Sequence, residues 1–106
     1  MRSVALLALA ACSSAPAATI EFFARSVDVV CTIEDHVLHN GFGCAVIEHL
    51  STQRITTPVV RIGWPDQFVE HGAPDILRKK HGLTVENTVK TILAALPAKA
   101  GAKSVA

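Results

Sequence analysis

The sequence predicts an α/β domain built around one parallel βαβ unit. Two short apolar segments, Val27–Ile33 and Val59–Ile62, have the composition of strands that are buried on both faces. Between them, residues 41–53 carry apolar side chains at helical spacing. A strand, a helix and a second strand with connections of this length form a right-handed crossover between parallel strands. We therefore expect a partial three-layer α/β sandwich, in which a short parallel βαβ unit is followed by two helices.

Three further segments are predicted to be helical. Residues 19–26 form a short helix with Thr19 at its N-cap. Pro74 suits the first position of a second helix, which Gly82 would terminate. Thr84 is expected to cap the last helix, whose apolar residues recur at i, i+4, i+7, i+8 and i+11 and predict one apolar stripe: Val85, Val89, Ile92, Leu93 and Leu96.

Length and composition limit the function classes. A chain of 106 residues forms at most one domain, and its net charge of +1 with 18% charged residues is ordinary for a globular α/β protein. A near-neutral chain lacks the basic face of nucleic-acid binders, and with no Tyr and a single Trp it lacks aromatic stacking platforms. Nucleic acid is therefore not an expected partner.

The three cysteines, Cys12, Cys31 and Cys44, have no paired spacing. An odd number without a repeat argues against a disulfide framework and against a cysteine zinc site. Cys31 lies in the first predicted strand and Cys44 at the start of the following helix, so we interpret both thiols as small hydrophobic groups.

Residues 1–18 differ in character from the rest of the chain. An apolar run ends in Leu-Ala-Ala before Cys12, which matches the cleavage box of a bacterial lipoprotein, and a Ser/Ala/Pro tract follows. The alternative is an Ala/Ser-rich start that arises from a mis-set reading frame. The run is too short for a stable membrane span. We expect the domain to occupy residues 19–96 and residues 97–106 to form a disordered tail.

Two strands alone make a marginal sheet. Without its two ends, the chain is near the smallest size at which a single core suffices. The sequence therefore indicates the second half of a larger α/β domain, which needs further strands or a partner.

Polar residues gather at the expected carboxyl edge of the sheet. Glu34 ends the first strand, and we expect Glu34 and His36 to hydrogen-bond loop backbone and to hold the turn at Gly41. The Asn-Gly-Phe-Gly turn lacks the lysine of a phosphate-binding loop, so Gly41 and Gly43 are assigned to a tight turn and to close helix–sheet packing.

Further polar residues lie in or after the second strand. Arg61 and His71 lie at the same edge of the sheet as Glu34, and an ion pair between Arg61 and Glu34 is a hypothesis. Asp66 belongs to a turn that begins at Pro65. The histidines His36, His39 and His49 lack the spacing of a metal motif, so no metal site is expected.

Three motifs in order carry a resemblance: Thr-Ile-Glu-Asp-His-Val-Leu from Thr32, Asn-Gly-Phe-Gly from Asn40, and Gly-Trp-Pro-Asp-Gln-Phe-Val-Glu-His-Gly from Gly63. Over about residues 28–96 the chain resembles the C-terminal domain of the 1-deoxy-D-xylulose-5-phosphate synthases, thiamine-diphosphate enzymes of the transketolase group. Asn40 stands where a glycine is more usual, and asparagine tolerates the same left-handed backbone.

The resemblance implies a transketolase C-terminal-like fold within an enzyme that condenses pyruvate with glyceraldehyde 3-phosphate for isoprenoid synthesis. Thiamine diphosphate and magnesium would be held by preceding domains, so no catalytic, cofactor-binding or metal-binding residue is carried over to this chain. The remaining candidates are structural or interface residues: Glu34, His36, Gly41, Gly43, Arg61, Asp66 and His71.

The implied partners are the missing thiamine-binding domains or a second subunit, and the implied location is the cytoplasm. Two alternatives stay open. One is a small exported lipoprotein anchored through Cys12, and the other is a stand-alone interaction module that completes its βαβ core by dimerising.

Overall fold

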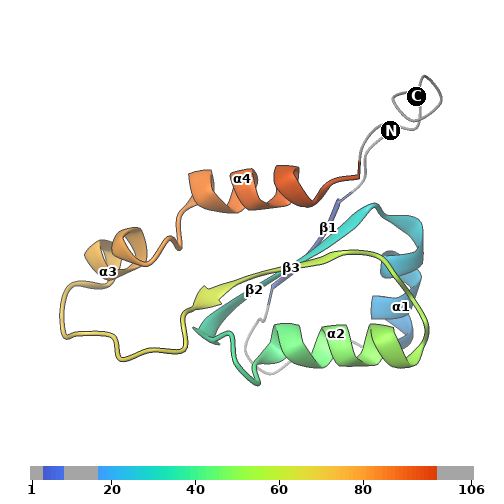
Figure 1. Cartoon of the computed structure of the whole chain (residues 1–106), viewed down its shortest axis with the longest axis horizontal. Coiled ribbons are helices and arrows are strands. Elements are labelled where there is room, and N and C mark those ends of the chain that lie inside the picture. The colour runs from blue at the N-terminus through green and yellow to red at the C-terminus, as the bar shows by residue number, and fades with distance from the viewer. Residues whose placement is uncertain (1–3, 9–16, 98–106) are drawn as a thin grey trace.

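The computed structural model describes residues 4–8 and 17–97. The chain forms a small parallel sheet with helices on both faces (Figure 1). Its elements, in chain order, are β1 (Val4–Ala8), α1 (Ala17–Ser26), β2 (Val29–Val37), α2 (Phe42–Thr52), β3 (Val59–Trp64), α3 (Pro74–Lys80) and α4 (Val85–Ala95).

The expectation of two strands is wrong, because the sheet has three parallel strands in the order β1-β2-β3. The additional strand β1 pairs with β2 in a continuous register from Val4 opposite Val29 to Ala8 opposite Ile33. A short apolar run has no periodicity that separates a buried strand from a leader segment. What decides the conformation of β1 is the open edge of β2, which is not visible in the run itself.

The predicted βαβ unit is confirmed, and the sheet separates two apolar clusters. Helices α1 and α2 cover one face and α4 lies over the other, which gives the expected partial three-layer arrangement (Figure 1). The first cluster joins β2 to α1 and α2 and contains Ala24, Val30, Val46, Leu50 and Ile55. The second cluster joins β2 and β3 to the end of α4 and contains Val29, Cys31, Val60 and Ile62, with Ile92, Ala95 and Leu96 packed against them.

Both predicted strands extend beyond their expected ends. β2 continues to Val37, with an irregular register against β3 after Ile33, and β3 continues through Gly63 to Trp64. The polar residues that follow Ile33 in the sequence are therefore part of the strand. As expected, Asn40 adopts a left-handed backbone, with φ of 55°.

Helix α4 begins after Thr84 as predicted, and the Thr84 hydroxyl accepts a hydrogen bond from the backbone N–H of Asn87 at 3.2 Å. Its apolar stripe is only partly covered. Ile92 and Leu96 pack on the sheet, whereas the stripe residues Val85, Val89 and Leu93 are exposed. Helix α4 thus meets the sheet through its C-terminal half, and its first turns stay open.

Within residues 4–8 and 17–97, no helix combines the length and the apolar character that crossing a bilayer requires.

Candidate functional site

The carboxyl edge of the sheet is organised around Glu34. Its side chain is buried, with the residue 1% exposed, and points from β2 to the start of α2. The backbone N–H of Phe42 donates to Oε1 at 3.0 Å, and the N–H of Gly43 donates to Oε2 at 2.7 Å. The N-cap residue Gly41 supplies no side-chain cap, so the carboxylate from the neighbouring strand takes that role. The expectation that Glu34 holds this turn is confirmed.

Neighbouring atoms lie so close to Gly41 and Gly43 that neither position has room for a side chain. A Cβ atom on Gly41 would collide with the Glu34 carboxylate and would lie 2.7 Å from the Val37 carbonyl oxygen. A Cβ atom on Gly43 would lie 2.7 Å from Thr32 Oγ1. The assignment of both glycines to a tight turn and to helix–sheet packing is confirmed.

Arg61 does not pair with Glu34, and this hypothesis is corrected. Among the described residues, the Arg61 guanidinium donates instead to the Leu38 carbonyl oxygen at 3.2 Å and to Cys44 Sγ at 3.0 Å. Arg61 lies opposite Thr32 in the register, two residues before Glu34, and both carboxylate oxygens of Glu34 are already occupied by backbone N–H groups. The guanidinium therefore shares the Leu38 carbonyl oxygen with the Cys44 thiol and leaves Glu34 to the start of α2.

The two described cysteines have different environments. Cys31 is fully buried in the sheet, as expected for a small hydrophobic group, and desolvation raises the pKa of its thiol. The interpretation of Cys44 as a purely hydrophobic group is wrong. Its thiol donates to the Leu38 carbonyl oxygen at 3.1 Å while its sulfur accepts from Arg61. Cys12 lies outside the described residues.

The remaining candidates do not join the Glu34 turn. His36 Nδ1 donates to the Val37 carbonyl oxygen at 2.8 Å and lies 4.0 Å from Glu34 Oε1, so His36 contacts its own strand and not the Gly41 turn. Asp66 and His71 are exposed, and their side chains form no hydrogen bond or ion pair with the part of the chain that the structure describes.

A second polar group, which the sequence reasoning missed, links the ends of β2 and β3 to α3. The Trp64 indole N–H donates to Asp35 Oδ1 at 2.6 Å, and Arg78 Nη2 lies 3.8 Å from Asp35 Oδ2. The Trp64 ring also meets His81 edge to face, with centroids 5.9 Å apart. The sequence does contain a sign of this contact. An indole N–H that packs against protein usually finds an acceptor, and Asp35, directly after Glu34, is an acidic residue at the same edge of the sheet as Trp64.

The loop itself is fastened to α3. Glu70 forms an ion pair with Lys80, and the hydrogen bond from Lys80 lowers the pKa of the Glu70 carboxyl. Gln67 Nε2 lies 3.3 Å from His81 Nδ1. Residues 65–73 are thereby held at two points against the end of α3.

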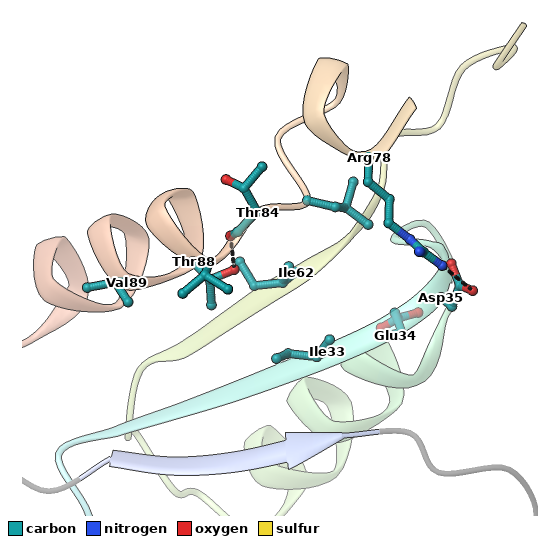
Figure 2. Close-up of a pocket in the computed structure, with 10 residues that line it drawn as sticks. Ile33, Glu34, Asp35, Ile62, Arg78, Thr84, Thr88 and Val89 are labelled. Carbon is teal, nitrogen blue, oxygen red and sulfur yellow. Dashed lines mark hydrogen bonds and ion pairs between the residues drawn. The ribbon is translucent and has the colours of Figure 1, made fainter. Parts of the chain in front are cut away.

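An open pocket of about 380 Å³ lies between the sheet and the first turns of α4. Ile33 and Ile62 form its floor, and Val89 and Thr88 come from α4 (Figure 2). Arg78 reaches over its rim toward Asp35 (Figure 2). The pocket is mainly apolar, and it exists because the start of α4 does not close on the sheet.

The start of α2 does not offer a free site for a diphosphate. A diphosphate needs free N–H groups or cations, and the first N–H groups of α2 already donate to Glu34. Groups of three or more His, Cys, Asp or Glu side chains in metal-binding proximity are absent from residues 4–8 and 17–97. This edge of the sheet holds the α2 turn in place.

Comparison with known proteins identifies the domain. The sequence pattern of the family "Transketolase, C-terminal domain" matches residues 2–88, which include β1. The chain belongs to the transketolase C-terminal domain family. The fold expected from the motifs at Thr32, Asn40 and Gly63 is thus confirmed for this transketolase C-terminal domain.

Relatives of this transketolase C-terminal domain include 1-deoxy-D-xylulose-5-phosphate synthases. The synthase of Methylacidiphilum infernorum is 60% identical over 75 residues, which are 71% of this chain and 12% of that protein. The synthase of Acidobacterium capsulatum is 50% identical over 70 residues, or 66% of this chain and 11% of that protein. The resemblance to the synthases is confirmed, and the chain spans about one-eighth of the length of the synthases it matches.

A solved structure titled "Split gene transketolase, inactive beta4 tetramer" has the same fold, with a TM-score of 0.68 and 27% sequence identity. The match covers 90% of this chain and 39% of that chain.

Proposed function

We propose that this chain is a non-catalytic assembly domain of a 1-deoxy-D-xylulose-5-phosphate synthase, inactive alone. The observation that carries the proposal is the contact of Glu34 with the N-terminus of α2. It places the protein's own carboxylate where an anionic cofactor or substrate group would otherwise bind. In this proposal, thiamine diphosphate, magnesium and the condensation of pyruvate with glyceraldehyde 3-phosphate belong to domains outside this chain.

A need for partners is supported by the surface of the molecule. Large apolar side chains are exposed on the loop after β3, on α3 and on α4, among them Phe68, Ile76 and Val85. Large apolar side chains that stay exposed are typical of surfaces that bind a partner. Two partners fit the comparisons: the remaining domains of a synthase, which make up most of the length of the relatives, and further copies of this chain, as in the tetramer of the split-gene transketolase.

We also propose that the domain extends into the first segment of the chain. The pairing of Val4–Ala8 with β2 and the family match from residue 2 support a structural use of this segment. A cytoplasmic location follows from the proposed function. The alternative, an exported lipoprotein, depends on Cys12, which lies outside the described residues and has no support from the comparisons.

The proposal is tested by assaying the purified chain for pyruvate decarboxylation with thiamine diphosphate and magnesium. We expect no turnover, and calorimetry with thiamine diphosphate should show no binding heat. Turnover above the rate of the cofactor in buffer would overturn the proposal.

A further inference from the structure

We propose that Asn40 is a site of spontaneous deamidation, at which the turn before α2 converts its own asparagine to aspartate and isoaspartate. The dipeptide Asn40-Gly41 places a side-chain carboxamide next to a backbone nitrogen whose own residue has no side chain to hinder attack. Asparagine is among the thermally labile residues of proteins. The inference concerns the lifetime of the fold and does not depend on the proposed assembly function.

The turn presents Asn40 to solvent. The N–H of Gly41 donates to the carbonyl oxygen of Leu38, which closes a four-residue turn with Asn40 at its third position. Asn40 is exposed, and its φ of 55° is the left-handed conformation that the third residue of a type II turn adopts. Within residues 4–8 and 17–97, no group holds its carboxamide by a hydrogen bond.

The backbone nitrogen of Gly41 is only weakly held. Its hydrogen bond to the Leu38 carbonyl oxygen is 3.4 Å long, beyond the usual range of roughly 2.7–3.2 Å. The same oxygen also accepts hydrogen bonds from the Cys44 thiol at 3.1 Å and from the Arg61 guanidinium at 3.2 Å. Since these two donors satisfy the Leu38 carbonyl, the Gly41 N–H can leave it without stranding an unpaired acceptor. The turn can therefore open at Gly41 while Cys44 and Arg61 keep their contacts.

The reaction needs only water as a co-reactant. The Gly41 nitrogen gives its proton to solvent and attacks Cγ of Asn40, so that the N–Cγ bond forms and the Cγ–Nδ2 bond breaks. Ammonia leaves with a proton taken from water. Water then opens the five-membered imide in one of two ways. Cleavage of the new N–Cγ bond gives aspartate, whereas cleavage of the bond between the Asn40 carbonyl carbon and the Gly41 nitrogen gives isoaspartate.

The isoaspartate product disturbs the start of α2. It routes the main chain through the former side chain and so adds one methylene group before Gly41. This residue has no room for such a displacement, because a Cβ atom there would already collide with the Glu34 carboxylate and lie 2.7 Å from the Val37 carbonyl oxygen. The N–H of Phe42, the next residue, donates to Glu34 Oε1 at 3.0 Å. The isoaspartyl chain therefore loses part of the Glu34 contact, whereas aspartate keeps the chain length and tolerates the left-handed backbone.

Asn87 is the matched control within the same chain. Its carboxamide donates to the Gly82 carbonyl oxygen at 2.8 Å. The backbone nitrogen that would attack it, that of Thr88, is tied into α4 by a hydrogen bond to the Thr84 carbonyl oxygen at 3.0 Å. Because Asn87 must break both hydrogen bonds to react, we expect Asn40 to convert at least roughly tenfold faster.

The experiment incubates the folded full chain in mildly alkaline buffer and follows each asparagine by peptide mapping with mass spectrometry. Methylation by an isoaspartyl methyltransferase identifies isoaspartate, and a parallel sample in urea gives the reactivity of the unfolded chain. We expect Asn40 to convert in the folded chain, with isoaspartate among the products, and Asn87 to remain. Asn40 that stays intact in the folded chain while it converts in urea would overturn the proposal, as would equal rates at Asn40 and Asn87 in the folded chain.

Two variants test the structural consequence. Asn40→Asp reproduces the aspartate product, and Asn40→Gly keeps the left-handed turn without a carboxamide. The isoaspartyl fraction should unfold at a lower urea concentration than Asn40→Asp, and Asn40→Gly should keep its unfolding midpoint through the same incubation. An isoaspartyl fraction as stable as Asn40→Asp would overturn the link between this site and the Glu34 contact. These measurements use no cofactor, substrate or partner, so their failure leaves the proposed function standing.

Discussion

The carboxylate of Glu34 accepts a hydrogen bond from the backbone N–H of Gly43 at 2.7 Å. A residue of β2 thus caps the N-terminus of α2. The contact joins β2 to α2 across the turn at Gly41 and buries a charged group with its hydrogen-bond donors in place. A helix N-terminus filled by the protein's own anion fixes the angle between strand and helix. The same contact explains why the glycine-opened helix of this domain does not need a phosphate to satisfy its first N–H groups.

Replacing Glu34 by Ala should destabilise the fold, because the N–H groups of Phe42 and Gly43 would lose a charged acceptor inside the protein. We expect a loss of about 2–4 kcal/mol in the free energy of unfolding. Urea denaturation followed by circular dichroism measures it, with the exposed Glu48→Ala as the control. Equal unfolding midpoints for the two variants would show that the Glu34 contact contributes nothing to stability.

Replacing Gly43 by Ala should also destabilise the chain. The added Cβ would lie 2.7 Å from Thr32 Oγ1 and 2.8 Å from the Arg61 side chain, so α2 would have to shift from the sheet. The expected cost is about 1–3 kcal/mol. Gly72→Ala is a matched control, because its Cβ would meet Leu77 only at 3.4 Å or beyond. Thermal unfolding that ranks Gly72→Ala as the less stable of the two would contradict this packing account.

The Glu70–Lys80 pair should make a small pH-dependent contribution to stability. The hydrogen bond from Lys80 lowers the pKa of Glu70 in the folded chain below the value of 4.5. A lowered pKa means that the stabilisation is present above the pKa of the unfolded chain and is lost as the pH falls through the folded value. Glu70→Gln should therefore lower the melting temperature slightly at neutral pH, and this difference should vanish as the pH falls through the folded pKa of Glu70. A difference in melting temperature between the two chains that grew on acidification would contradict this account.

Cys31 should resist alkylation in the folded chain, whereas the half-buried Cys44 should react. Burial raises the pKa of the Cys31 thiol above 9.0, so fewer thiolates form there and access is blocked. By the same linkage, stability should fall as the pH rises past 9.0, because only the unfolded chain then loses this proton. Iodoacetamide labelling with peptide mapping tests whether Cys44 reacts before Cys31. Preferential labelling of Cys31 without unfolding would contradict its assigned place in the sheet.

The features that were predictable from sequence are local ones. The turn at Gly41, the left-handed Asn40 and the Thr84 cap each depend on neighbouring residues, and the structure confirms them. The role of Glu34 was also accessible, because a carboxylate at a strand end and a glycine-opened helix are close in sequence.

The features that were missed depend on distant partners. The Val4–Ala8 run becomes a strand only because β2 offers an open edge. Arg61 was assigned to Glu34 because both were placed at the same edge of the sheet. The register sets Arg61 opposite Thr32, and its guanidinium donates to the Leu38 carbonyl oxygen and to the Cys44 sulfur. The spacing of apolar residues in α4 predicts one apolar stripe but does not show which turns of the helix contact the sheet.

We propose that this chain serves assembly and that the chemistry belongs to other domains. The most direct measurement mixes the purified chain with the Methylacidiphilum infernorum synthase from which its own C-terminal domain has been removed, and follows pyruvate consumption with thiamine diphosphate and magnesium. We expect the chain alone to be inactive and the mixture to regain activity that the truncated synthase lacks. Turnover by the chain alone, or a mixture no more active than the truncated synthase, would contradict the account.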